Sequence, residues 1–380
     1  MSTKGTEPAR VLIWTGAVLP GSETFIRNQS DALRRWSPKL AGLFRQSSPL
    51  SRHDDRSLYT SSRLDAFLLQ LFKLTGHSRR ADRLIRTWQP QVIHAHFLPN
   101  GWRISRSAQR HGVPLLVTAH GSDALSWPRQ RGLRGVFAKH QMRQVFRRAA
   151  LIFAVSEFVR RRIIELGAEP HKVVVHYTGI PISSTPSSGR NKHWDVAFVG
   201  RFVEVKGIFD LIDSLDLVAA HQATSAVLVG DGELMSLVRE RASRSMANIT
   251  ILGQQSPEAA RRVIEQSRVL AGPSRKSSDG SIEGLGMVFL EAAASGVPVV
   301  ATVHGGIPEA VRHGATGLLS PEGDIVALAD NIRRVLNDEA FANQLAMAGR
   351  TRALEFFDVE RQTAKLEEIY DAIVRNDSDA

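Results

Sequence analysis

The sequence contains no cysteine, and this absence narrows both the chemistry and the setting of the protein. Without thiols the chain forms no disulfides, builds no thiolate metal site and has no cysteine nucleophile, and it suits a reducing compartment such as the cytoplasm. No apolar run approaches the ~20 residues that span a bilayer, so no transmembrane helix is expected. With 380 residues and 43% hydrophobic side chains, the chain is long enough for two domains of roughly 150 residues each.

Acidic residues are scarce in the first half only. Residues 1–190 hold 30 Lys and Arg against 11 Asp and Glu, a net charge of +19. Residues 191–380 hold 19 against 27, a net charge of −8, and the two halves sum to the +11 of the whole chain. A basic half joined to an acidic half implies different partners. Anionic lipid or a phosphorylated acceptor suits the basic half, and no nucleic acid is expected because zinc-finger spacing and RNA-binding motifs are absent.

Short apolar runs alternate with amphipathic helical stretches along the whole chain. This pattern predicts an α/β fold with two Rossmann-like parallel sheets. A stretch rich in Pro, Ser and Gly at 179–193 predicts a boundary between domains 1–185 and 190–355, with a final helix at about 359–374 able to pack on either half. The expected strands are 10–15, 92–96, 115–119, 151–155 and 172–176 in the first half, and 194–199, 225–229, 249–252, 268–271 and 297–301 in the second.

Two cations and two glutamates of the second half stand near predicted strand ends, where ligands bind in doubly wound sheets. Arg201 follows a strand and Gly200, and Lys206 comes five residues later. Together these cations could neutralise a diphosphate, although two solvated loop cations would give the same pattern. Glu283 and Glu291 bracket a glycine-rich turn that opens a helix, and free N–H groups at a helix start bind anions and hydroxyls.

These segments resemble family 4 of the retaining glycosyltransferases. The resemblance rests on Arg201 with Lys206, on the Glu283–Glu291 pair, and on the flanking stretches 293–302, 305–309 (Gly-Gly-Ile-Pro-Glu) and 314–319 (Gly-Ala-Thr-Gly-Leu-Leu). It covers nearly the whole chain and is densest from residue 196 to 325. It implies the GT-B fold, in which two Rossmann-like domains face across a cleft. It also implies retaining sugar transfer from a nucleoside-diphosphate sugar, with no metal and no cofactor.

The resemblance implies a role for each matching residue. Arg201 and Lys206 would bind the donor diphosphate, and Glu291 would hold the ribose hydroxyls. Glu283 would contact the donor sugar, and His120 would lie beside that sugar and be needed for activity. The implied catalytic residues are therefore His120, Arg201, Lys206 and Glu283. The implied donor-binding residues are Gly21, Gly200, Arg201, Lys206, Gly253, Gln254, Glu283, Gly284, Leu285, Gly286, Met287, Val288 and Glu291.

Within that set, Gly253 and Gln254 would border the base, and the loop at Gly21 would reach toward the donor phosphate. Many family members have two consecutive glycines in that loop, whereas this chain has Gly21 and Ser22.

The expected acceptor contacts in the first half are Glu23, His96 and Asp123. Ser-Glu-Thr-Phe-Ile at 22–26 and His-Ala-His-Phe at 94–97 resemble the branch of the family that builds bacterial exopolysaccharides, including colanic-acid and amylovoran-type enzymes. Asp123 could instead orient His120. His94 and His96 also have the spacing of a metal-ligand pair, but no third ligand stands nearby in the sequence, so no metal site is expected. The expected roles of this pair are a structural one or contact with the acceptor.

A predicted helix with an apolar stripe next to cations indicates whether the acceptor lies at a membrane. Such a helix can lie on an anionic membrane, and ordinary core packing accounts for the stripe equally well. The stripe consists of Leu64, Phe67, Leu68, Leu71 and Phe72, and cations gather at 79–86 and 131–148.

We therefore expect a cytoplasmic enzyme, peripheral at the inner face of the cell membrane. It would transfer sugar to a polyprenyl-diphosphate-linked or other glycan acceptor in bacterial cell-surface or exopolysaccharide synthesis. Two alternatives remain open. One is transfer to a small soluble acceptor, as in thiol, natural-product or sugar-phosphate biosynthesis. The other is a scaffold that binds a nucleotide sugar without turnover.

Overall fold

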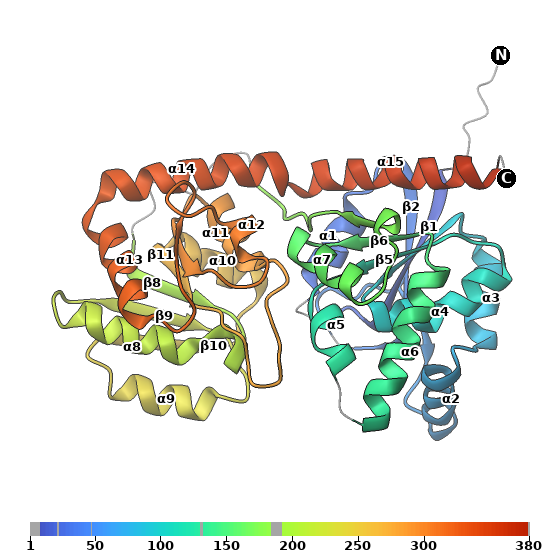
Figure 1. Cartoon of the computed structure of the whole chain (residues 1–380), viewed down its shortest axis with the longest axis horizontal. Coiled ribbons are helices and arrows are strands. Elements are labelled where there is room, and N and C mark those ends of the chain that lie inside the picture. Colours follow the sequence, from blue (N-terminus) through green and yellow to red (C-terminus); the bar gives the residue numbers. More distant parts are fainter. Residues whose placement is uncertain (1–7, 21–22, 47, 130–131, 184–191, 379–380) are drawn as a thin grey trace, which may run out of the picture. The chain divides into compact units, whose positions relative to one another are not determined.

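The computed structural model describes residues 8–20, 23–46, 48–129, 132–183 and 192–378. The chain divides into two compact units: unit 1 comprises Met1–Pro181 and Val359–Ala380, and unit 2 comprises Ile182–Asp358. Each unit contains one parallel sheet with helices on both faces (Figure 1), so the predicted α/β fold with two Rossmann-like sheets is confirmed. Residues 184–191, most of the predicted linker, lie outside the described residues.

The sheet of unit 1 has the strand order β3-β2-β1-β4-β5-β6-β7, and its neighbours pair in parallel. Both β4 and β5 are buried along their whole length, because helices cover both faces of a parallel sheet. The strands are β1 (Ala9–Val18), β2 (Trp36–Arg45), β3 (Arg56–Tyr59), β4 (Val92–His96), β5 (Leu115–Ala119), β6 (Leu151–Ala154) and β7 (Val173–Val175). The helices are α1 (Thr24–Asp31), α2 (Arg63–Thr75), α3 (Arg79–Trp88), α4 (Leu98–Arg110), α5 (Ser122–Leu125), α6 (Gly132–Arg148), α7 (Glu157–Glu165) and α15 (Val359–Ser378).

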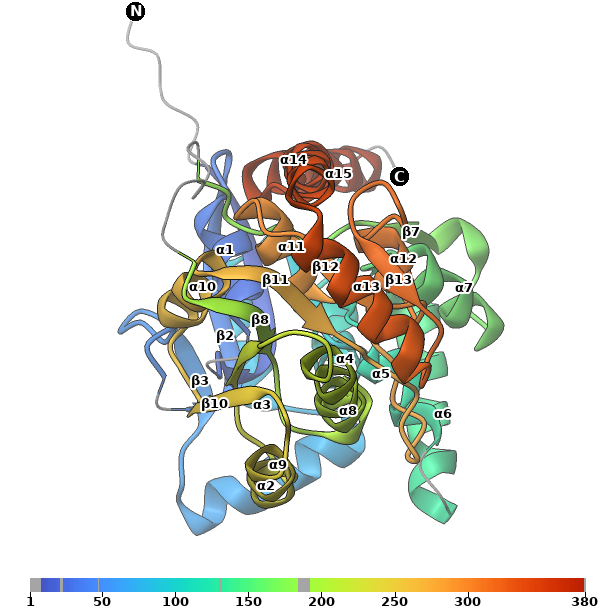
Figure 2. The ribbon, with the colours of Figure 1, turned by 90° about the vertical axis from the view of Figure 1, so that its left-hand side faces the viewer.

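Different helices cover the two faces of the unit 1 sheet. On one face, Ile26 of α1 and Tyr370 of α15 join the buried core with the strand side chains. On the other face α4 packs against β1, β4 and β5, and it comes so close that a Cβ at Gly101 would lie 2.9 Å from Val117 Cγ2. Helices α2 and α6 pack on the outside of α4 and project from the same end of unit 1 in both views (Figures 1 and 2).

The sheet of unit 2 has the strand order β10-β9-β8-β11-β12-β13 and is also parallel. Helices α8 and α13 share a core on one face, and α10 and α11 lie on the other (Figure 2). The strands are β8 (Trp194–Val199), β9 (Ser225–Val229), β10 (Asn248–Gly253), β11 (Ser267–Gly272), β12 (Val299–Thr302) and β13 (Leu318–Ser320). The helices are α8 (Ile208–Ala219), α9 (Met235–Ser243), α10 (Pro257–Glu265), α11 (Met287–Ala294), α12 (Ile307–Ala310), α13 (Ile325–Asn337) and α14 (Glu339–Phe356).

All ten predicted strands are present, and the structure adds β2, β3 and β13, which the sequence pattern did not predict. Strand β2 carries Pro38 and Gly42, two residues that usually argue against a strand interior. Gly42 is needed there because a Cβ would lie 2.9 Å from Thr15 Oγ1 on β1. Strands β3 and β13 have only four and three residues, too few to show a periodic pattern.

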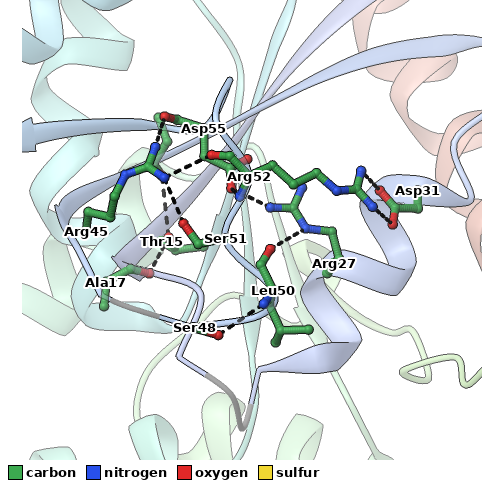
Figure 3. Close-up of polar contacts among 11 residues, drawn as sticks. Thr15, Ala17, Arg27, Asp31, Arg45, Ser48, Leu50, Ser51, Arg52 and Asp55 are labelled. Carbon is green, nitrogen blue, oxygen red and sulfur yellow. Dashed lines mark hydrogen bonds and ion pairs between the residues drawn. The ribbon is translucent and has the colours of Figure 1, made fainter. Parts of the chain in front are cut away.

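A buried ion pair ties α1 to the segment between β2 and β3 (Figure 3). The Arg27 Nη2 and Asp55 Oδ2 atoms lie 2.5 Å apart, and both side chains are buried. Arg27 Nε also donates to the Leu50 carbonyl oxygen at 3.0 Å, and the Arg52 backbone N–H donates to the same Asp55 oxygen at 2.6 Å. Buried charges persist only when such partners satisfy them. This network therefore fixes the orientation of α1, which begins directly after Glu23.

Candidate active site

The turn after β8 places the first predicted cation. Strand β8 ends at Val199, and the Gly200 N–H donates to the Val229 carbonyl oxygen at 3.0 Å. Gly230 packs against this turn with φ +146°, and a Cβ there would lie 1.8 Å from the Gly200 carbonyl oxygen. Only glycine fits such a close backbone approach. The turn therefore leaves the Arg201 side chain exposed at the carboxyl end of β8.

Lys206 closes a short 3₁₀ turn (Glu204–Lys206) immediately before α8. The Arg275 N–H donates to the Val205 carbonyl oxygen at 2.9 Å, which holds this turn against the segment after β11. Gly207 follows with φ +62°, and a Cβ there would lie 1.9 Å from the Pro273 carbonyl oxygen. Because α8 begins at Ile208, Lys206 stands beside N–H groups that lack partners within the helix, an arrangement suited to an anion.

Glu283 is held through its own backbone. Its N–H donates to His304 Nε2 at 3.1 Å, and its carbonyl oxygen accepts the Gly306 N–H at 3.1 Å. Gly305 has φ +53°, and a Cβ there would lie 2.1 Å from the same carbonyl oxygen. His304 in turn is buried and its Nδ1 lies 2.6 Å from Glu322 Oε1. The turn 304–306 therefore fixes the Glu283 peptide from both sides.

The Glu283 carboxylate forms an ion pair with the Lys206 ammonium group, 77 residues away in the sequence. Burial alone would raise the pKa of Glu283, but the Lys206 charge and hydrogen bond outweigh it and hold that pKa below its ordinary value. The structure thus brings two of the predicted site residues into direct contact.

Helix α11 begins next to this pair and carries the second glutamate. Gly286 caps the helix with φ +84°, and the N–H groups of Met287 and Val288 open its first turn. Glu291 lies in the second turn, where burial raises its pKa to about 6 although Arg261 favours the charged form. Gly284 and Leu285, like Gly286, are buried.

The two residues predicted to border the base lie farther along the sheet edge. Gly253 ends β10 with φ +69°, and its carbonyl oxygen accepts the Gly230 N–H at 2.9 Å. Gln254 follows with an exposed side chain. Gly21, predicted for the phosphate-facing loop, lies outside the described residues.

In unit 1, His120 follows β5 and lies among three rings. The ring centroids of Phe25 and Phe97 lie 4.6 and 4.5 Å from that of His120, and both rings are tilted against it. His96 stacks on His120 with a centroid distance of 5.3 Å, and its Nδ1 lies 3.1 Å from His120 Nε2. Burial, reinforced by His96, lowers the pKa of His120 well below its ordinary value. His120 is therefore a neutral imidazole.

The predicted acceptor residue His96 is only 2% exposed and lies behind His120. Its burial leaves it no surface with which to contact an acceptor in this structure, and it supports His120 instead. The alternative of a His94–His96 metal pair is also not favoured by the contacts. The two ring nitrogens of His94 each lie 2.6 Å from a hydroxyl oxygen, that of Tyr370 and that of Thr118.

Asp123 holds the backbone around His120. Its Oδ1 accepts N–H groups from His120, Gly121 and Ala124 at 3.0, 3.0 and 3.1 Å, and its Oδ2 accepts the Leu98 N–H at 2.8 Å. Burial raises the pKa of Asp123 to about 6 even though these donors favour the carboxylate. Of the two roles predicted for Asp123, these contacts support orientation of His120.

Glu23 differs from the other predicted acceptor residues because its side chain has no such partners among the residues that the structure describes. Its Oε2 is buried without a hydrogen-bond partner among the described residues, and burial raises its pKa to about 7. The side chain precedes Phe25, which packs on His120. A partly enclosed carboxyl group two residues before Phe25 is suited to a sugar hydroxyl.

Four residues of these sites were not predicted from the sequence: His304, Glu322, Phe25 and Phe97. His304 directly precedes the Gly-Gly-Ile-Pro-Glu stretch, and Phe25 and Phe97 belong to the two stretches of the exopolysaccharide resemblance. Their positions in or next to these stretches could have indicated a role in the site. Their contacts, however, join different elements and become visible only in the fold.

Two family models match the chain. The one described as Glycosyltransferase Family 4 matches residues 21–184, and the one described as Glycosyl transferases group 1 matches residues 184–352. The chain belongs to family 4 of the glycosyltransferases.

Curated relatives agree with this membership. A glycogen synthase of Mycobacterium tuberculosis is 28% identical over 77% of this chain and 71% of its own length. The amylovoran biosynthesis glycosyltransferase AmsK of Erwinia amylovora is 25% identical over 60% of this chain and 58% of its own length. The expected likeness to exopolysaccharide enzymes is thereby confirmed. The matches support glycosyltransferase activity in polysaccharide or other glycan synthesis.

A solved structure shows the same fold. The Anabaena protein Alr3699/HepE in complex with UDP superposes with a TM-score of 0.77 at 20% identity, covering 96% of this chain and 100% of that chain. The GT-B fold expected for the family is therefore confirmed. Among the described residues, every helix is too short or too polar to cross a bilayer.

Proposed function

We propose that this family 4 enzyme transfers a sugar from a nucleoside-diphosphate sugar to a lipid-linked glycan in bacterial surface or exopolysaccharide synthesis. We further propose that the transfer retains the anomeric configuration and needs no metal ion. The observation that carries the donor half of the proposal is the Lys206–Glu283 pair, which lies at the starts of α8 and α11. The UDP bound to the Anabaena neighbour and the family membership support such a donor.

Each unit 2 residue has a role in this proposal that suits its chemistry. Arg201 and Lys206 neutralise the donor diphosphate, the guanidinium as a fork and the ammonium as a point charge. Glu291 accepts hydrogen bonds from the ribose hydroxyls, because an ionised carboxylate only accepts. Glu283 and the N–H groups at the start of α11 contact the sugar and its phosphate.

The proposed reaction proceeds on one face of the sugar. The bond between the anomeric carbon and the diphosphate oxygen breaks, the acceptor oxygen bonds to the same face, and the leaving diphosphate takes the acceptor proton. Charge that grows on the diphosphate is stabilised by Arg201 and Lys206, which supply the cations that a metal ion would otherwise provide. Glu283 positions the sugar in this scheme and forms no covalent bond with it.

A thermal-shift screen with UDP-, GDP- and ADP-sugars tests donor binding. Binding to the folded state alone raises the melting temperature with donor concentration. We expect a shift with one base that is lost in Glu291→Ala and kept in Glu355→Ala, an exposed glutamate of α14 in the same unit. A shift that survives Glu291→Ala would overturn the ribose assignment. Absence of any shift would count against the donor class.

Product stereochemistry and metal dependence need separate tests. Proton NMR of the first product should show the anomeric configuration of the donor, and transfer should continue in excess EDTA. Inversion of the anomeric centre, or loss of transfer that added Mg²⁺ or Mn²⁺ restores, would overturn the respective part of the proposal.

The lipid-linked acceptor is supported by an exposed apolar face on unit 1. Four apolar side chains of α2 point outward at spacings of three, four and three residues, and Phe72 alone of the predicted stripe is fully buried. Three apolar side chains at the start of α6 are also exposed, and farther along this helix the Gln141 side chain donates to the Lys73 carbonyl oxygen of α2 at 3.0 Å. We call these side chains the α2–α6 face: Leu64, Phe67, Leu71, Leu74, Leu133, Val136 and Phe137.

Exposed cations stand around this face, among them Arg63 on α2 and Arg134, Lys139 and Arg143 on α6. Apolar side chains among cations are suited to the headgroup region of an anionic bilayer, where each Lys or Arg contributes about 1 kcal/mol. Such contact would bring a membrane-embedded acceptor to the enzyme.

Vesicle sedimentation tests this contact. The protein should sediment with phosphatidylglycerol-containing vesicles, less with pure phosphatidylcholine, and less at high salt. Phe67→Ser with Leu133→Ser should weaken sedimentation, whereas Leu237→Ser, an exposed apolar position in unit 2, should not. If the wild type stays in the supernatant with both lipids, transfer to a small soluble acceptor replaces the lipid-linked one. Donor binding without transfer to any glycan would favour the inactive scaffold.

A further inference from the structure

Three imidazole rings form a stack within unit 1. The ring centroids of His94 and His96 lie 4.7 Å apart with an interplanar angle of 24°, and those of His96 and His120 lie 5.3 Å apart at 23°. His94 and His96 come from alternate positions of β4, so their side chains share one face of the sheet. His120 comes from the loop after the neighbouring strand β5. The stack links the sheet interior to the ring with the proposed catalytic role.

The hydrogen bonds differ along the stack. Both nitrogens of His94 meet hydroxyl groups, which can donate or accept, so either tautomer of His94 is satisfied. His96 has a single partner: its Nδ1 lies 3.1 Å from His120 Nε2, while its Nε2 is buried without a partner in the described part of the chain. The side chain of His96 therefore has one satisfied and one unsatisfied nitrogen.

This asymmetry selects a tautomer. Between His96 Nδ1 and His120 Nε2 there is one proton, and it belongs to one ring or the other. If His120 donated, the neutral His96 ring would carry its proton on Nε2 and bury an N–H group without an acceptor. If His96 donates, the buried Nε2 is a bare lone pair, and orphaned N–H groups are rarer in proteins than under-satisfied acceptors.

We propose that His96 is a positioning residue that donates Nδ1–H to His120 Nε2 and thereby fixes His120 as the tautomer with its proton on Nδ1. His120 Nδ1 bonds to no described residue and the His120 side chain is partly exposed, so its N–H can reach a ligand. His120 then acts as a neutral hydrogen-bond donor, toward a sugar hydroxyl or phosphate oxygen, and not as a base. The identity of the ligand rests on the proposed function, whereas the tautomer assignment rests only on the contacts of His96 and His120.

Histidine tautomers can be read without substrate. Long-range ¹H–¹⁵N spectra of ¹⁵N-histidine-labelled protein distinguish a protonated ring nitrogen from a bare one, and His96→Asn and His120→Asn assign the signals. We expect the proton on Nδ1 in both rings. A proton on Nε2 of His120 would overturn the inference, whatever the donor screen shows.

Two substitutions separate positioning from packing. The amide nitrogen of Asn at residue 96 can occupy the place of the imidazole Nδ1, whereas the longer Gln side chain carries its amide nearer the place of Nε2. His96→Asn should keep most of the turnover. His96→Gln should lower kcat, by up to about 100-fold given the cost of misplacing a catalytic group by 1 Å, with little change in donor KM. Equal activity of the Asn and Gln variants would contradict a role for the Nδ1 donor.

A double substitution gives the decisive comparison. If His96 acts through His120, His96→Gln should have no further effect on kcat in a His120→Ala background. A loss of the same size in both backgrounds would show that His96 acts independently of His120. If even the wild type shows no sugar transfer, the proposed function fails, and the tautomer spectra still decide the inference.

Discussion

The two units hold their candidate residues by different physical means. In unit 2 the site depends on backbone: Gly207, Gly230 and Gly305 have positive φ, and a Cβ on any of them would lie within about 2 Å of a backbone carbonyl carbon or oxygen. In unit 1 it depends on buried side chains: the imidazole stack ends at His120, and Asp123 gathers the N–H groups around it. The proposed donor, with its two negative phosphates, needs loops that bring charged side chains close together. A neutral imidazole needs a fixed orientation.

The charges follow the same division. Lys206 and Glu283 face each other as an ion pair, which holds the ammonium group at the place proposed for the donor diphosphate. Such preorganisation costs no rearrangement during the reaction. Unit 1 instead buries its ion pair Arg27–Asp55 beneath α1, away from any role in chemistry, and leaves neutral rings at the candidate site.

The largest effect should come from a methyl group at Gly207. In Gly207→Ala the Cβ would lie 1.9 Å from the Pro273 carbonyl oxygen, and the residue would have to keep φ +62°. We expect the free energy of unfolding of unit 2 to fall by more than about 4 kcal/mol, the range reserved for severe backbone conflicts. Urea denaturation followed by circular dichroism measures this loss.

Gly314→Ala is the matched control. Gly314 also has positive φ, but a Cβ there would meet nothing within 4 Å. It should cost only the left-handed backbone strain of about 1–2 kcal/mol. If the two variants lost equal stability, close backbone approach would not be what shapes the Lys206 turn.

The matching substitution in unit 1 is Asp55→Ala. It leaves the Arg27 guanidinium buried and unpaired, so we expect a loss of about 3–5 kcal/mol. Arg34→Ala serves as control, because Arg34 and Glu360 form an ion pair on the surface of the same unit that should contribute about 0–1 kcal/mol. Similar losses in both variants would contradict the importance of burial. Intrinsic tryptophan fluorescence during denaturation follows both.

The sequence predicted what is local and missed what is distant. Apolar runs located ten strands. The family resemblance named Arg201, Lys206, Glu283 and Glu291 as donor residues, and that assignment stays a prediction. Nothing in the pattern could show that Lys206 pairs with Glu283, because their contact depends on how two loops 77 residues apart meet at the sheet edge.

The same limit explains the unit 1 results. Two roles were expected for His96, a structural one and contact with an acceptor. The fold buries its ring in a stack with His94 and His120, which supports the structural role. Burial depends on the whole fold, and a pattern along one strand cannot report which neighbours enclose its tip. The apolar stripe of α2 has the same limit. Core packing and membrane contact predict the same stripe, and they differ only in whether protein or lipid lies opposite the helix.

Next in size is the catalytic effect of Lys206. Lys206→Ala removes the proposed phosphate cation and leaves the Glu283 carboxylate without its partner. We expect kcat to fall about 10²–10³-fold, by analogy with removal of an oxyanion donor. Lys206→Arg keeps the charge and should retain more activity. A loss confined to KM, with kcat unchanged, would mean that the cation binds donor and transition state equally.

The smallest effect should be a difference in acid sensitivity. Burial lowers the pKa of His96 to about 3 and of His176 to about 4, and it lowers those of His94 and His120 well below the ordinary value. As pH falls below about 6.5, the unfolded chain binds protons that these folded rings do not. Each ring can therefore reduce the free energy of unfolding by up to about 1.4 kcal/mol per pH unit.

Buried carboxyls act with the opposite sign. Asp123 and Glu23 in unit 1 have pKa values raised to about 6 and about 7, so the folded chain binds protons that the unfolded carboxyls release above pH 4–4.5. Their gain in the free energy of unfolding offsets the loss from at most two of the four histidines. Glu291 in unit 2 has its pKa raised to about 6. Its protonation in the folded state therefore increases the free energy of unfolding of unit 2 as pH falls from about 6 toward 4.5, the pKa of the unfolded state. Acid should therefore weaken unit 1 and strengthen unit 2.

Chemical denaturation at pH 7.0, 6.0 and 5.5 would resolve this difference if each unit is followed by its own probe. His176→Gln provides the control, because His176 Nε2 lies 3.0 Å from the Gln362 carbonyl oxygen and a Gln amide can donate there without titrating. In this variant the free energy of unfolding of unit 1 should fall less at low pH, by the contribution of one histidine, at most about 1.4 kcal/mol per pH unit. Equal acid dependence in the two units would mean that the buried imidazoles accept protons in the folded state. The stack would then no longer hold His120 as a neutral donor.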